Sequence, residues 1–189
     1  MGIWGDVCAR VIAICLSSYT TYAVNDAFNS EGKTDKDQKD FLAMIFLICN
    51  VSAFFFSYIY GRASNHYQVS MIILAANSFL FIFGFFMVYD LDNIGWIFAV
   101  SYCVVGSMNT SNFVLSQTML HGALKKESRA SVLSVQGLVG SLAMILQAKI
   151  VPYIYDNYSH QWAFIVCFIF VLMYYITLLI YHMKVKNKD

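Results

Sequence analysis

A stripe of polar residues runs along the apolar segment 94–120. Asn109, Asn112 and Ser116 are spaced at i, i+3 and i+7, so a helix places them on one face, and Gly106 continues that face. Amide side chains both donate and accept hydrogen bonds, so this stripe can line a path for a small neutral or polar solute. The same groups can instead hydrogen-bond neighbouring helices inside a membrane. The sequence leaves both interpretations open.

Further amides stand in other apolar segments and extend the hypothesis of a solute path. The predicted substrate path comprises Asn50, Gly106, Asn109, Asn112, Ser116 and Gln136. Small residues at four-residue spacing on a separate segment are predicted to serve helix packing, because small side chains let helix backbones approach closely. These packing residues are Ala130, Ser134, Gly137 and Ser141.

Motifs for other chemistries do not occur in the sequence. There is no phosphate-binding P-loop, no G-x-S-x-G elbow and no H-E-x-x-H zinc motif. The five cysteines form no C-x-x-C pair, and the four histidines lie at the ends of apolar segments. A net charge of +1 gives no footprint for nucleic acid. We therefore expect no enzyme activity, no catalytic residue, no metal and no cofactor.

Long apolar segments are the elements that must position these residues. Hydrophobic residues make up 59% of the chain and charged residues only 12%, against about 25% charged in a typical globular domain. Each long run approaches the roughly 20 residues that cross a bilayer as a helix. Runs of this length exclude a barrel, and only helices or barrels satisfy their backbone groups in lipid. Five such runs are Phe41–Tyr60, Val69–Tyr89, Ile94–Leu120, Ala130–Tyr153 and Trp162–Tyr181.

The segment Val7–Phe28 is a less clean candidate for a sixth span. Asp6 and Arg10 lie four residues apart, so on a helix they share a face and are expected to neutralise each other near the membrane surface. An interfacial helix is the alternative. The prediction is an all-α bundle of six transmembrane helices in a single domain over residues 1–189. Its spans are expected at approximately 7–28, 41–60, 69–89, 94–120, 130–153 and 162–182.

The distribution of lysine and arginine predicts the orientation in the membrane. Basic residues gather in the loop after the second span, in the loop after the fourth span and in the C-terminal tail: Arg62, Lys125, Lys126, Arg129, Lys184, Lys186 and Lys188. On the opposite side, the loops 90–93 and 155–161 have none, and the loop 29–40 is mixed, with three lysines against four carboxylates. Both termini are therefore expected on the cytoplasmic side, or on the matrix or stromal side in an organelle. The sequon at Asn157 then lies outside and is a glycosylation candidate.

Two stretches carry a resemblance to a known family. Residues 60–67 read YGRASNHY, and residues 127–134 read ESRASVLS before a helix rich in small residues; a last segment opens with QWAF. The order of segments and these stretches resemble one six-helix half, most like the C-terminal half, of a major facilitator superfamily transporter. The resemblance implies a cytoplasmic gating loop at Gly61 and Arg62. The family's acidic position in that loop is filled here by Ser64 or Asn65.

The resemblance implies a membrane solute transporter, or half of one, and the uncharged amides suggest that its solute is small and neutral or polar. A full transporter of this family has two such halves, which implies a second membrane chain or self-association within the lipid bilayer. No Asp, Glu, Lys or Arg lies centrally in the second to sixth spans, and Asp26 is the one candidate for an ion-coupling carboxylate. The alternative function is a non-catalytic accessory subunit of a larger membrane complex.

Overall fold

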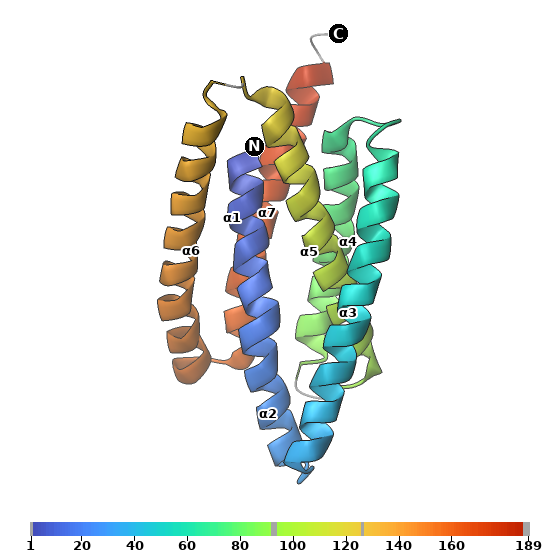
Figure 1. Cartoon of the computed structure of the whole chain (residues 1–189). Coiled ribbons are helices and arrows are strands. Elements are labelled where there is room, and N and C mark those ends of the chain that lie inside the picture. The colour runs from blue at the N-terminus through green and yellow to red at the C-terminus, as the bar shows by residue number, and fades with distance from the viewer. Residues whose placement is uncertain (1, 92–93, 126, 187–189) are drawn as a thin grey trace.

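Six long helical rods lie side by side in the computed structural model, which describes residues 2–91, 94–125 and 127–186 (Figure 1). The predicted all-α membrane bundle is confirmed. The first rod consists of α1 (Gly2–Ile14), a π-helical segment η1 (Cys15–Tyr19) and α2 (Thr20–Ser30). The other rods are α3 (Asp35–Ala63), α4 (Val69–Tyr89), α5 (Trp96–Ala123), α6 (Arg129–Asn157) and α7 (His160–Lys186).

The π-helical segment interrupts the first rod without breaking it. The backbone N–H of Thr20 donates to the carbonyl of Cys15, five residues earlier, where an α-helix would use the fourth. The Thr21 hydroxyl donates to the Ser17 carbonyl at 2.8 Å and the Ser17 hydroxyl to the Ile14 carbonyl at 3.4 Å. The buried Thr20 hydroxyl has no partner among the described residues. One extra residue in the turn rotates the faces of α2 relative to α1 by about 100°.

A capping box starts α3 after a tight turn. The Thr34 hydroxyl accepts from the Asp37 backbone N–H at 3.3 Å, and the Asp37 carboxylate accepts from the Thr34 backbone N–H at 3.1 Å. Gly32, two residues earlier, has φ of 68°, a conformation that favours glycine. These contacts fix the reversal between α2 and α3.

The central helix is α5, which packs against α1, α3 and α4. By length and composition, five of the described helices are apolar enough to cross a membrane: the first rod, α3, α4, α6 and α7. The N-terminal segment, the less clean candidate in the sequence, is among these helices, whereas α5 is less apolar; its segment 94–120 stays a predicted span. Serine, asparagine and glutamine side chains lower the hydropathy of α5, and neighbouring helices bury them away from lipid.

The ends of the described chain share one end of the bundle with the α3–α4 and α5–α6 connections (Figure 1). The α2–α3, α4–α5 and α6–α7 connections lie at the opposite end, which we call the outer end. This arrangement groups Arg62, Lys125 and Arg129, as the charge pattern requires; Lys126 and Lys188 lie outside the described residues. Which end faces the cytoplasm stays a prediction.

Large apolar side chains cover the outside of the bundle. Phe54 on α3 is 71% exposed and Leu138 on α6 is 63% exposed, and many neighbours on both helices are similar. In water such faces would be an aggregation hazard, whereas in a bilayer they meet lipid or another membrane chain. α6 packs mainly against α1 and α7, with hydrogen bonds to α2 and α5 at Tyr155 and Arg129, so most of its surface is open.

Candidate functional site

The predicted polar stripe of α5 is engaged in hydrogen bonds to three other helices. The Asn109 amide donates to the Ala9 carbonyl of α1 at 3.0 Å. The Asn112 amide donates to Asn77 Oδ1 of α4 at 3.1 Å. The Ser116 hydroxyl lies 2.9 Å from the Tyr174 hydroxyl of α7. All three stripe residues are buried.

Little space is left beside the stripe. A cavity of about 10 Å³ adjoins Asn77, Asn109 and Asn112, which is room for roughly one water molecule. Gly5 of α1 lies so close to Ser116 and Tyr174 that a methyl group there would collide with both. These contacts are those of the helix-packing alternative, and the role of the stripe in a solute path stays a prediction.

The remaining residues of the predicted path do not gather at one place. Asn50 is exposed on α3 and its amide donates to the Phe46 carbonyl at 2.7 Å. Gly106 provides the close approach of α5 to Cys49 of α3. Gln136 of α6 is only 3% exposed, and within the described part of the chain its Oε1 atom has no hydrogen-bond partner.

The other predicted site residues lie at helix surfaces and ends. Gly61 and Arg62 belong to the last turn of α3 rather than to a loop, and the Gly61 carbonyl accepts from the Ser64 hydroxyl at 2.6 Å. Asn157 is the last residue of α6 and is exposed, and its amide donates to the Tyr153 carbonyl at 2.8 Å.

The small residues predicted to pack helices face away from the bundle. Ala130, Ser134 and Ser141 are exposed, and a methyl group added at Gly137 would meet no atom within 4 Å. They therefore form no close helix contact within the described chain.

A cluster of charged and amide side chains lies inside the bundle between α1 and α5. Asp6 is fully buried, with 0% exposure. Its Oδ2 atom accepts from Arg10 Nε at 2.9 Å, and its Oδ1 atom accepts from Gln117 Nε2 of α5 at 3.1 Å. The expected pairing of Asp6 with Arg10 is thus confirmed. We refer to Asp6, Arg10 and Gln117 as the charge cluster.

The charge cluster lies deeper than the sequence indicated. A Cβ atom at Gly140 of α6 would lie 2.9 Å from Arg10 Cδ and Nε, so the Arg10 side chain rests against the bare backbone of that helix. Gly140 stands eleven residues after Arg129, about 17 Å along α6. The Arg10 side chain keeps 33% exposure. The i, i+4 spacing of Asp6 and Arg10 was visible in the sequence. Their depth inside the bundle was not, because it depends on how far α5 and α6 extend beyond the start of α1.

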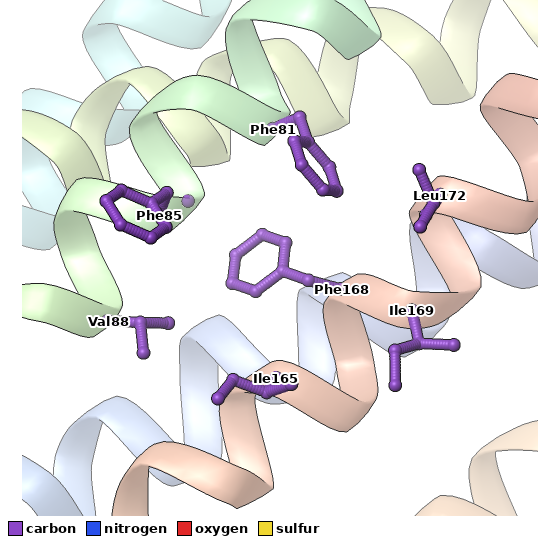
Figure 2. Close-up of a pocket in the computed structure, with 8 residues that line it drawn as sticks. Phe81, Phe85, Val88, Ile165, Phe168, Ile169 and Leu172 are labelled. Atoms are coloured by element: carbon purple, nitrogen blue, oxygen red, sulfur yellow. The ribbon is translucent and has the colours of Figure 1, made fainter.

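Two larger hollows in the bundle are apolar. One of about 400 Å³ lies between α1, α6 and α7, where Gln147 is its one amide side chain. Another of about 220 Å³ lies between α4 and α7. Figure 2 shows the Phe168 ring reaching from α7 toward Phe81, Phe85 and Val88 of α4, where Gly84 makes room for it. Linings of this kind suit acyl chains or apolar side chains and offer a polar solute no partner.

Comparison with family models gives one match, to the Major Facilitator Superfamily, over residues 8–189. The chain belongs to the Major Facilitator Superfamily. The resemblance found in the sequence is therefore confirmed, and the fold is that of a family of membrane transporters that are generally not enzymes. Neither the curated proteins nor the solved structures give a match.

Proposed function

We propose that this Major Facilitator Superfamily chain supplies a six-helix unit of a solute transporter whose polar site is the charge cluster. The observation that carries the proposal is the fully buried Asp6, held by Arg10 and Gln117. Ionisable groups inside a membrane are costly, and they most often mark a substrate or ion pathway. The cluster therefore ranks above the amide stripe as the polar site of this unit.

The chemistry of the cluster favours a small neutral or zwitterionic solute. Asp6 and Arg10 cancel each other's charge, so the site attracts neither free anions nor free cations strongly. Both oxygens of Asp6 are engaged, while the Gln117 side chain of α5 and the partly exposed guanidinium of Arg10 beside α6 remain as polar groups. Hydroxyl, amide and zwitterionic groups fit such a mixture of donors and acceptors.

Gln136 extends this polar side of the bundle. It stands one helical turn from Gly140, the residue that contacts Arg10, and so lies on the same face of α6. A buried amide oxygen without a partner costs about 1–3 kcal/mol. A solute hydroxyl or a side chain of a second unit would satisfy it, which keeps Gln136 in the proposed path.

A second six-helix unit is part of the proposal, because alternating access in this fold works by rocking one unit against another. The exposed faces of α3 and α6 offer apolar surface for it, and the small residues of α6 permit close approach. Another copy of this chain, a different polypeptide or a further domain of the same polypeptide can each supply the second unit.

A non-catalytic accessory subunit is the second candidate function. The observation that favours it is the amide stripe of α5, whose hydrogen bonds to α1, α4 and α7 leave only about 10 Å³ of free space. A bundle whose helices are joined by these hydrogen bonds can bind neighbouring membrane helices without transporting a solute.

Reconstitution into proteoliposomes tests the transporter proposal. The solutes are a radiolabelled hexose, a polyol and a zwitterionic amino acid, each assayed for saturable uptake. The double variant Asp6→Asn/Arg10→Gln keeps the polar groups without the charges, so we expect it to fold and to lose at least about tenfold of the flux. Lys149→Gln, which removes an exposed charge from α6, is the control and should keep full flux. Full flux in the double variant would remove the cluster from the mechanism.

A further inference from the structure

A hollow lined by tyrosines lies at the outer end of the bundle, between the first rod and α6. Its volume is about 220 Å³, and its lining consists of Tyr19, Tyr22, Pro152, Tyr155 and Asp156. We call it the tyrosine hollow. It is smaller than the roughly 300–1,000 Å³ of pockets for drug-sized ligands, so its occupant is small.

The aromatic rings form walls at an angle to each other. The Tyr22 and Tyr155 ring centroids lie 6.3 Å apart with an interplanar angle of 53°. The buried Tyr19 contributes a third ring, and its hydroxyl donates to the Gln147 carbonyl at 3.4 Å, which holds it against α6. Inclined aromatic faces around a small space are the arrangement that attracts ammonium groups through the ring quadrupole.

Carboxylates add negative charge on both sides of Tyr155. Asp156 lines the hollow, and within the described residues no Lys or Arg lies within ion-pair distance of it. Asp26 Oδ2 accepts the Tyr155 hydroxyl at 2.7 Å, and this bond makes the ring richer in electrons. The two segments that meet here, 11–32 and 150–183, contain no Lys or Arg, and the adjoining cations are Lys33, which pairs with Glu31, and Lys149, three residues before Pro152. The carboxylates Asp26 and Asp156 are thus the charges closest in the chain to Tyr155 and the tyrosine hollow.

The His160 imidazole already shows that a nitrogen-containing group can pack on the Tyr155 ring beside a carboxylate. The His160 imidazole stacks on the Tyr155 ring with centroids 4.1 Å apart and planes 10° from parallel, and its Nε2 lies 3.7 Å from Asp26 Oδ2. His160 lines a neighbouring hollow with Asp26 and not the tyrosine hollow. A planar nitrogen base is thus held between a tyrosine face and a carboxylate just beside the tyrosine hollow.

We propose that the tyrosine hollow is a binding site for a small organic cation, namely an alkylammonium group held by the three tyrosine rings and Asp156. A hard metal cation would instead need several converging oxygen ligands, and the described residues hold no group of three metal-ligating side chains. An uncharged apolar guest would leave Asp156 without a partner. The inference does not depend on which solute crosses the membrane.

Calorimetric titration of the full chain in maltoside detergent tests the site. The probe is tetramethylammonium chloride, with sodium chloride at equal concentration as the salt control and tert-butanol as the uncharged analogue. We expect saturable binding of the cation and none of the alcohol. Absence of saturable binding, or equal binding of the alcohol, would overturn the proposal.

Paired variants locate the binding. Tyr155→Ala and Asp156→Asn should each weaken binding by about tenfold, the loss of one cation–π wall or one charge. Tyr155→Phe keeps the ring but loses the bond to Asp26, so we expect a loss of only about threefold. Tyr153→Ala, two residues earlier and outside the lining, is the matched control and should bind normally. Equal affinity of all four variants would refute the site; if Tyr155→Ala does not fold, the exposed Asp156→Asn decides.

An alkylammonium group reaches this end of a membrane protein either as a free solute or on a lipid headgroup. Nanodiscs of phosphatidylcholine and of phosphatidylglycerol separate these sources. If tetramethylammonium binds more weakly in phosphatidylcholine than in phosphatidylglycerol, and if Asp156→Asn abolishes this difference, the headgroup competes for the hollow. Equal binding in both lipids would assign it to a free cation. Because binding is measured without flux, failure of transport leaves this inference standing, and failure of binding leaves the transporter proposal standing.

Discussion

The buried charge of Asp6 depends on two neighbouring side chains, and substitutions of these partners can test that dependence. Asp6 has lost all contact with solvent, and its two oxygens depend on Arg10 and Gln117. Separating a buried ion pair leaves the remaining charge without compensation, which costs far more than the pair itself contributes. The free energy of unfolding is therefore expected to fall when one partner is removed and to recover when both are replaced.

Arg10→Leu should lower the free energy of unfolding by about 3 kcal/mol, because it leaves the Asp6 carboxylate buried without its cation. Adding Asp6→Asn removes the buried charge and keeps an oxygen that accepts from Gln117, so the double variant should recover most of the loss. Denaturation in detergent, followed by circular dichroism, measures both. Lys149→Leu, at an exposed cation of α6, is the control and should change little. An additive effect of the two changes would contradict the coupling.

Helix contacts in this bundle depend on a few positions where a side chain is missing. Gly140 gives Arg10 room between α1 and α6, while Gly137, one turn earlier, borders open space. Gly106 likewise gives room to Cys49, and Gly84 gives room to Phe168. The α1–α6 contact is the most informative of these, because it also positions the charge cluster.

Gly140→Ala and Gly137→Ala form a matched pair on α6. The added methyl at Gly140 would lie 2.9 Å from Arg10 Cδ and Nε, so Arg10 must move and its bond to Asp6 weakens. We expect a loss of about 1–3 kcal/mol in unfolding free energy. At Gly137 the same change meets nothing and should stabilise the helix by up to about 1 kcal/mol. Thermal melting of both proteins in one detergent compares them, and equal melting temperatures would refute the close α1–α6 contact.

The π-helical segment makes a separate prediction about the first rod. Deletion of the exposed Ser18 turns η1 into ordinary α-helix and keeps the faces of α1 and α2 in register with their neighbours. Deletion of the exposed Ala13 in α1 instead rotates one part of the rod by about 100° relative to the other. We expect the Ser18 deletion to remain monodisperse on size exclusion and the Ala13 deletion to aggregate. The reverse order would contradict the assignment of the extra residue to 15–19.

The positions of the helices were largely predictable from the sequence, whereas the contacts between helices were not. Apolar runs of bilayer length locate the helices, because lipid imposes that length on each of them. The face occupied by Asn109 and Asn112 was also predictable from spacing, but the sequence does not say that Ala9 and Asn77 face them. The low hydropathy of α5 became understandable only with its central position. The depth of Asp6 and the π-helical turn at 15–19 likewise depend on tertiary packing.

At the scale of the whole molecule, membership of the Major Facilitator Superfamily joins these features into one unit. The central α5 holds α1, α3 and α4 together, and α6 stands at the edge with most of its surface open. Three of the buried polar atoms that have no partner among the described residues lie on α6, at Arg129, Gln136 and Gln147, and the others are at Thr20, Ser57 and Asn112. The proposed solute path and the proposed second unit both belong to the side of α1 and α6.

Protection of a cysteine at position 117 by the transported solute tests the central claim most directly. In a background without the five native cysteines, Gln117→Cys is alkylated by a maleimide in proteoliposomes with and without saturating solute. Thr118→Cys, the exposed neighbour on α5, is the matched control. If the charge cluster is the polar site, the solute slows alkylation at 117 by at least about tenfold and leaves 118 unchanged, since a bound solute excludes the reagent from its own site. Equal alkylation at 117 with and without a solute that the Gln117→Cys protein itself still transports would contradict the account.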